Sequence, residues 1–361
     1  MTAALLQGSR AIADSALAAG CRFFAGYPML PFTDLLEAMS AKMPAAGGTC
    51  INAESEIAAV NMTLGAAAAG ARAATGSCGQ GIALMQETIA EAALNEVPFV
   101  VFNMARGQQD YWQATRGGGW GDYRTITLAP KDVPEAVAHT QLLFHLADLY
   151  RAPVCMYGDY LVAHTHVSVD VQPLDLGPLP AKDWALDGTA GGTGRSRQIW
   201  TWAMGRDDAP GPGPDVHWRR LAAKFADIGD TEARHETFRC EDAEWVVVSF
   251  GTSSPFVDHV VEELRGDGVR IGSFRPITLW PFPERALADA VSRARGVLVF
   301  EVNAGQMLDD VRLAVGGLTP VRFIGGVSID SSGMRQGELL TVGAIRTGIL
   351  DAVGSLAGVA P

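Results

Sequence analysis

Pro98-Phe99-Val100-Val101-Phe102 is the strongest strand signal in the first half of the chain. A short apolar run of this kind is typical of a strand buried on both faces of a sheet. A helical pattern over Gly81 to Leu94 precedes it. A strand at Thr125 to Leu128, a helix at Val133 to Tyr150 and a strand at Pro153 to Tyr157 follow it. Because strands that alternate with helices over short connections form parallel sheets, the sequence predicts a parallel sheet covered by helices.

The same alternation extends back towards the N-terminus. The segments expected there are a helix over Ser9 to Gly20, a strand over Cys21 to Ala25, a helix over Thr33 to Met43, a strand around Cys50 and Ile51, a helix from about Glu56 and a strand over Ala71 to Thr75. Thr33 or Asp34 is suited to cap the second of these helices, since a side-chain oxygen there accepts a hydrogen bond from a free backbone N–H.

The pattern changes between Leu174 and Asp242, where proline and glycine cluster and one helix, about Val216 to Ile228, is expected. This connecting segment also contains Trp184, Trp200, Trp202 and Trp218, which indicates that it packs on both of its neighbours.

A second α/β unit begins with the apolar run Trp245 to Phe250. Its further segments are helices over Pro255 to Leu264, Arg285 to Arg293 and Gln306 to Val315, and strands over Val269 to Gly272, Gly296 to Phe300 and Val321 to Ile324. The sequence therefore predicts two α/β domains with parallel sheets in three layers, over residues 1–170 and 243–361, joined by a connecting segment over residues 171–242.

Composition excludes several classes of protein. Of the 361 residues, 48% are apolar and 19% charged, which fits neither a disordered chain nor a coiled coil. The 28 basic and 40 acidic residues leave a net charge of −12, which does not favour nucleic-acid binding. No apolar run reaches the ~20 residues of a membrane span and no secretory signal is visible, so we expect a cytoplasmic protein that binds no membrane. None of the five cysteines forms a CxxC pair, so we expect buried free thiols and no metal ligands.

Three features could carry chemistry, and each also has a plain structural interpretation. Glu54 and Glu56 precede an apolar helix, where a carboxylate either serves the helix start or faces a proton carrier. The stretch Thr75 to Gly81 joins a strand to a helix, as either a tight turn or a ligand loop. Arg106 follows a strand at the edge where open α/β sheets bind ligands, and either binds a carboxylate or forms a structural salt bridge.

Seven segments, in the same order and over nearly the whole chain, resemble the alpha subunit of 2-oxoacid:ferredoxin oxidoreductases. The resemblance is greatest to the 2-oxoisovalerate type. The segments are Gly20 to Pro28, Glu54 to Ala59, Gly81 to Glu87, Asp110 to Gly119, Gly121 to Arg124, Arg275 to Pro283 and Asn303 to Met307.

The resemblance implies that residues 1–170 form the pyrimidine-binding domain of a thiamine diphosphate enzyme and residues 243–361 a transketolase C-terminal-like domain. It also implies a beta subunit that holds the diphosphate and Mg²⁺, which agrees with the absence of a GDG…N signature; Gly266-Asp267-Gly268 reads as a surface turn. Further partners would be an iron–sulfur subunit with [4Fe-4S] clusters, a gamma subunit or fusion, and ferredoxin. The implied reaction is the oxidative decarboxylation of a 2-oxoacid, with coenzyme A as acyl acceptor in those members that use it.

The resemblance also assigns site residues. Glu56 matches the glutamate that hydrogen-bonds the aminopyrimidine ring and so promotes removal of the thiazolium proton, which makes it both the catalytic and a cofactor-binding residue. The other implied residues are Gly79, Gln80 and Gly81 beside the cofactor and Arg106, Tyr27, Pro28 and Leu30 beside the substrate.

Two departures from the family pattern bear on the substrate. Leu30 stands where relatives carry a threonine that helps to hold the substrate carboxylate, and Phe32 stands where they carry a serine. The stretch after Arg106 is reduced to Gly107-Gln108-Gln109. Together with Met29, the two apolar replacements predict a less polar pocket, which favours branched-chain or aryl 2-oxoacids.

Two other functions compete with this one. The chain could belong to a non-oxidative thiamine diphosphate decarboxylase or ligase, which needs no iron–sulfur partner, or it could be a catalytically silent assembly partner. Retention of Glu56 argues against a silent chain, and the missing diphosphate signature argues against an enzyme that works alone.

Overall fold

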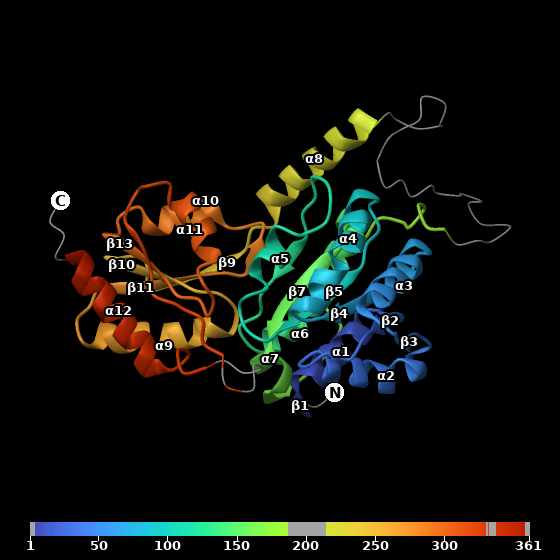
Figure 1. The fold of residues 1–361 in the computed structure, drawn as a ribbon, viewed down its shortest axis with the longest axis horizontal. Helices are drawn as coiled ribbons and strands as arrows, with labels where there is room; N and C mark the ends of the chain where they lie inside the picture. Colours follow the sequence, from blue (N-terminus) through green and yellow to red (C-terminus); the bar gives the residue numbers. More distant parts are fainter. Residues whose placement is uncertain (1–3, 187–213, 330, 332–336, 358–361) are drawn as a thin grey trace.

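The structure is a computed structural model that describes residues 4–186, 214–329, 331 and 337–357. Two sheets flanked by helices lie side by side, the first built mainly from the N-terminal half of the chain and the second from the C-terminal half (Figure 1). The predicted α/β architecture, dominated by parallel strands, is confirmed. In the described ranges, no helix is long and apolar enough to span a bilayer.

The first sheet has seven strands in the order β12-β6-β7-β5-β4-β2-β3, and all neighbours are parallel except β12 and β6. The strands are β2 (Phe23–Gly26), β3 (Thr49–Asn52), β4 (Ala73–Ser77), β5 (Val100–Ala105), β6 (Ile126–Leu128), β7 (Val154–Asp159) and β12 (Thr278–Trp280). Strand β5 is buried along its whole length, as its unbroken apolar sequence predicts.

Helices cover this sheet, with α1 packed against α2 and α6, and α3 packed against α4. They are α1 (Gly8–Ala18), α2 (Thr33–Lys42), α3 (Glu56–Ala68), α4 (Gln80–Leu94) and α6 (Val133–Tyr150). Two short helices, α5 (Tyr111–Thr115) and α7 (Tyr160–His164), follow β5 and β7, and β1 (Ala4–Gln7) pairs with β8 (His166–Val169) in a small antiparallel sheet. The sequence patterns did not predict these short elements.

The second sheet has five strands in the order β14-β13-β10-β11-β9, of which only β9 runs antiparallel to its neighbour. The strands are β9 (His235–Phe238), β10 (Trp245–Val248), β11 (Ile271–Pro276), β13 (Gly296–Val299) and β14 (Val321–Phe323), and the helices are α9 (Ser254–Gly266), α10 (Glu284–Val291), α11 (Met307–Val315) and α12 (Val342–Ala357). The fully buried runs of β10 and β13 form its centre.

The two halves share structure at their junction. Strand β12 follows the second sheet's β11 along the chain, yet it pairs with β6 and so extends the first sheet. Strand β9 belongs to the predicted connecting segment, where no strand was expected, and pairs with β11. Because β12 and β9 each join a sheet outside their predicted segment, the sheets do not divide cleanly at residues 170 and 242. The two domain boundaries remain predictions.

The connecting segment packs on both neighbours where it is described. Helix α8 (Pro214–Thr231) buries Leu221 and Ile228 in the core of the first domain. Its Asp230 pairs with Arg285 of the second unit at 3.5 Å. Trp200 and Trp202 lie outside the described residues, as do most of the segment's proline- and glycine-rich stretches.

Three local predictions are corrected. Helix α2 begins at Thr33 with Phe32 as its N-cap residue, and neither Thr33 nor Asp34 caps it through a side chain, because both already lie in its first turn. Cys50 and Cys240 are only half-buried, whereas Cys21, Cys78 and Cys155 are buried free thiols as expected. Phe32, predicted to line the pocket, is fully buried in the core, where it stacks on Phe24 with 6.0 Å between ring centroids.

Candidate active site

The predicted site residues gather at the carboxyl ends of β2, β4 and β5, the edge where open α/β sheets bind ligands. Leu30 follows β2, Gly79, Gln80 and Gly81 follow β4, and Arg106 directly follows β5. Helix α3 brings Glu56 to the same edge, next to the end of β4. The parallel order of these three strands explains why segments far apart in sequence meet here.

Glu56 is the first residue of α3 and is almost completely buried, with 4% of its surface exposed. Ser55 caps the helix by accepting a hydrogen bond from Ala58 N at 3.2 Å. The Ser77 hydroxyl donates to Glu56 Oε1 at 3.3 Å. Glu54, by contrast, is exposed. Glu56 is therefore the carboxylate that the fold directs inward.

Gly81, in the first turn of α4, leaves the space that this carboxylate occupies. A Cβ atom at Gly81 would lie 2.5 Å from Glu56 Oε1 and 2.0 Å from Ser77 Oγ. Any other residue would force both polar groups to move. Gly81 thus serves close approach to a buried carboxylate, which is more than a tight turn requires.

The loop before α4 is fixed by a second buried carboxylate, Asp110. The backbone N–H of Gly79 donates to Asp110 Oδ2 at 2.8 Å, and Gly79 adopts a positive φ of 52°. Burial raises the pKa of Asp110, while the hydrogen bond from Gly79 opposes that shift. The Cys78 thiol donates to Leu30 O at 3.1 Å, and burial raises its pKa to about 12, so it is a structural thiol.

The Arg106 guanidinium lies over the same loop. It donates to Leu30 O at 3.2 Å and to Gln80 Oε1 at 3.3 Å, and its Nη2 is 3.1 Å from Met29 Sδ. Within the part of the chain that the structure describes, no carboxylate forms an ion pair with Arg106. The guanidinium is therefore free to bind an anionic group from outside the chain, which favours the ligand interpretation over the structural salt bridge.

The remaining predicted residues form the outer rim. Leu30 is 44% exposed and Tyr27 37% exposed, and Pro28 is exposed beside them on the loop after β2. Of the three apolar residues predicted to wall the pocket, Met29 and Leu30 contact Arg106 or its neighbours, whereas Phe32 points into the core. Gly26 and Gly76 leave room for the Phe32 ring, since a Cβ at either would come within 3 Å of it.

Sequence reasoning assigned no role to Ser77 or Asp110. Both lie inside segments that had been singled out, Ser77 in the glycine-rich loop and Asp110 at the start of a family match. Nothing in the pattern indicates that Asp110 contacts Gly79, because the two are 31 residues apart. No group of His, Cys, Asp and Glu side chains within the described ranges could hold a metal ion.

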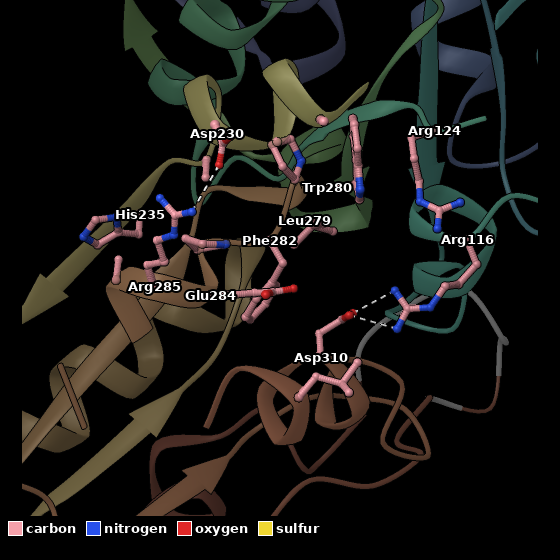
Figure 2. Close-up of a pocket in the computed structure, with 17 residues that line it drawn as sticks. Arg116, Arg124, Asp230, His235, Leu279, Trp280, Phe282, Glu284, Arg285 and Asp310 are labelled. Carbon is pink, nitrogen blue, oxygen red and sulfur yellow. Dashed lines mark hydrogen bonds and ion pairs between the residues drawn. The ribbon is translucent and has the colours of Figure 1, made fainter. Parts of the chain in front are cut away.

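A separate cleft of about 750 Å³ opens where the two units meet α8, and it contains none of the predicted site residues (Figure 2). Trp280 and Phe282 line it together with Arg116, which points towards Asp310 across the cleft. Its charged residues largely pair with one another, Arg116 with Asp310 at 2.9 Å and Arg285 with Asp230 at 3.5 Å. This cleft is a junction between units, and the Glu56 site is the better candidate for chemistry.

Comparison with solved structures places the fold. The chain superimposes on a 2-oxoglutarate:ferredoxin oxidoreductase from Magnetococcus marinus with a TM-score of 0.81 and 23% identity, covering 99% of this chain and 65% of that chain. It also superimposes on a split-gene transketolase with a TM-score of 0.61 and 10% identity. These two likenesses show the fold of the chain.

Sequence comparison then narrows the class to a family. Residues 14–185 match the thiamine diphosphate-binding domain of pyruvate flavodoxin/ferredoxin oxidoreductases, and residues 243–334 match core domain II of pyruvate:ferredoxin oxidoreductase. Ketoisovalerate oxidoreductase subunit VorB of Methanothermobacter marburgensis is 33% identical over 88% of this chain and 91% of its own length. 2-Oxoglutarate synthase subunit KorA of Methanothermobacter thermautotrophicus is 35% identical over 88% of this chain and 93% of its own length. The chain belongs to the 2-oxoacid:ferredoxin oxidoreductase family, as the resemblance predicted.

Proposed function

We propose that the chain is the alpha subunit of a thiamine diphosphate-dependent oxidoreductase that decarboxylates a 2-oxoacid oxidatively, and that Glu56 is its catalytic carboxylate. The observation that carries this proposal is the burial of Glu56 between Ser77 and Gly81 at the strand ends. The family membership supports the reaction, and the geometry supports the residue.

The residues fit the pyrimidine side of thiamine diphosphate. Glu56 offers one buried carboxylate in the space that Gly81 leaves, which suits a hydrogen bond to a ring nitrogen. When bound, the cofactor supplies the carbon nucleophile and the electron sink for decarboxylation. Glu56 would hold a proton at the ring nitrogen, and Gly79, Gln80 and Gly81 would border the ring. Because Glu56 is buried, water would screen its interaction with that ring only weakly.

The substrate side of the site would be Arg106, with Leu30, Tyr27 and Pro28 at the rim. Arg106 has no carboxylate partner within the described chain and would bind the substrate carboxylate in a bidentate manner. Leu30 adds no hydroxyl to that contact. Met29 and Leu30 give the neighbouring wall an apolar character, which supports a branched-chain or aryl 2-oxoacid.

Partner subunits would complete the site. This chain lacks a GDG…N signature, so a beta subunit would supply the diphosphate and Mg²⁺ contacts. Exposed apolar side chains on the elements that carry the site suit burial against such a partner, and they are Tyr27, Leu30, Ile57, Met62 and Leu84. An iron–sulfur subunit with [4Fe-4S] clusters, with a gamma subunit or fusion, would carry the electrons to ferredoxin.

The test is a substrate screen of the co-expressed, anaerobically purified complex with a dye acceptor. We expect 2-oxoacid-dependent dye reduction that Glu56→Gln abolishes and that the matched control Glu54→Gln retains. Release of carbon dioxide without dye reduction would instead indicate a non-oxidative decarboxylase. No turnover with any 2-oxoacid would indicate a silent chain.

A further inference from the structure

The loop that carries Arg106 and Asp110 is bound along one side by the second domain. Residues 106–116 run from the end of β5 through α5, and Figure 1 shows α5 between the two sheets. Three residues at and before α11 contact this loop, and they are Asn303, Gln306 and Asp310.

The side chain of Gln108 forms hydrogen bonds with backbone atoms of the second domain. Its Nε2 donates to Phe250 O at 3.1 Å, and its Oε1 accepts from Val302 N at 2.6 Å. Asn303 Nδ2 donates to the backbone oxygen of Gln108 at 2.8 Å. Gln108 and Asn303 are almost completely buried, with 2% and 0% exposed, so each hydrogen bond lost would leave a polar group without water.

Gln306 binds the loop on both sides of Asp110. Its Nε2 donates to Gln109 O at 2.9 Å, and its Oε1 accepts from Trp112 N at 2.9 Å. Asp310 then fixes the end of the loop, because Tyr111 donates to it at 2.6 Å and Arg116 forms a two-pronged ion pair with it, seen in Figure 2. Asp110 therefore sits between backbone atoms held by Gln306.

Hydrogen bonds connect this loop to the residues of the candidate active site. Asp110 accepts from Gly79 N, and Gly79 borders Gln80, which accepts from Arg106. Arg106 itself is two residues before Gln108. From these contacts we infer that the second domain positions the substrate-binding arginine and the loop before α4, with Gln306 and Asn303 as positioning residues for the reaction. This inference rests on the proposed role of Arg106.

A double-mutant cycle in the assembled complex tests the inference. Gln306→Ala should lower kcat/KM for the 2-oxoacid by about tenfold, mainly through KM, because two hydrogen bonds that place the loop are lost. In an Arg106→Ala background the same substitution should lower kcat/KM less than twofold. Gln306→Glu retains the acceptor for Trp112 N but sets a carboxylate oxygen against Gln109 O, so it should not recover the loss. Equal penalties in both backgrounds would overturn the inference.

Hydrogen exchange supplies a readout that is independent of activity. In the complex, Gln306→Ala should speed amide exchange over residues 106–116 and leave residues 56–68 of α3 unchanged. Glu135→Gln is the control, because it weakens a contact between the units, the 2.7 Å ion pair with Arg275, without touching the loop. Unchanged exchange over residues 106–116 would overturn the inference. If the wild-type complex turned over no 2-oxoacid, the proposed function would fail, while the exchange result would still decide whether the second domain holds the loop.

Discussion

The two sides of the site are built in different ways. Glu56 is held by Ser55, Ser77 and Gly81, all within one sheet and its helices. Arg106 lies on a loop whose shape depends on residues about 194 positions further along the chain, such as Val302 and Gln306. The proposed proton-handling group therefore needs one domain, whereas the proposed substrate-binding group needs both. Substitutions should divide along this line, those near Glu56 acting on kcat and those near Arg106 on KM.

The largest effect on turnover is expected from substitution of Glu56. Glu56→Gln keeps the hydrogen-bonding shape but removes the carboxylate, so kcat should fall by roughly 100- to 10,000-fold, the contribution typical of a positioned acid–base group. Steady-state dye reduction by the complex measures this fall. Glu54→Gln should retain most of the activity, because Glu54 is exposed. If the two variants behaved in reverse, the placement of the catalytic carboxylate would be wrong.

The next largest effect on the kinetic constants is expected from substitution of Arg106. Arg106→Ala should raise KM and lower kcat/KM by roughly 10- to 100-fold, as expected for loss of a charge-assisted contact to a carboxylate. Arg106→Lys should restore little, because an ammonium group does not bind a carboxylate through two parallel hydrogen bonds. Initial rates over a range of 2-oxoacid concentrations give both constants. An unchanged KM would contradict the assignment.

A smaller effect is expected on substrate choice. The apolar wall of Met29 and Leu30 should favour branched-chain or aryl 2-oxoacids over pyruvate, which leaves the wall uncovered, and over 2-oxoglutarate, whose second carboxylate would be desolvated. Competition between pairs of 2-oxoacids in the complex measures the preference. A clear preference for 2-oxoglutarate would contradict the apolar pocket.

The smallest effect on turnover is expected at His139, which lies at a contact between the units away from the loop. Its pKa is lowered to about 4, mainly by burial; the nearby charges of Arg275 and Arg234 act in the same direction, while Glu135 and Glu236 oppose them. The unfolded chain therefore binds more protons than the folded chain between about pH 6.5 and 4. Above this window His139 is neutral in both states and does not lower the free energy of unfolding. As the pH falls through the window, that free energy decreases by up to about 3 kcal/mol.

Thermal unfolding of the complex from pH 7 to pH 4 checks this prediction. The midpoint of the wild type should fall relative to that of His139→Asn as the pH decreases, while kcat at neutral pH should stay the same in both. A constant difference between the two midpoints would contradict it.

Local patterns predicted most of the long elements. The apolar run at β5 and the helix before it were readable because burial on both faces leaves a continuous apolar signal. The sequence physics alone left Glu56 open between two roles, and the family resemblance decided its assignment. Strand β12 and the contact between Gln108 and Asn303 could not be predicted, because both depend on pairing between distant segments. Phe32 was misplaced because the sequence does not reveal which way a side chain points in the loop before α2.

The central claim is that Glu56 acts on the bound cofactor, and proton exchange tests it most directly. In the assembled complex loaded with thiamine diphosphate, the exchange of the thiazolium C2 proton for deuterium can be followed by quenched-flow NMR without any substrate. The account predicts that Glu56→Gln slows this exchange by at least about 100-fold while Glu54→Gln leaves it near the wild-type rate. Wild-type exchange in a Glu56→Gln complex that still holds its cofactor would contradict the account.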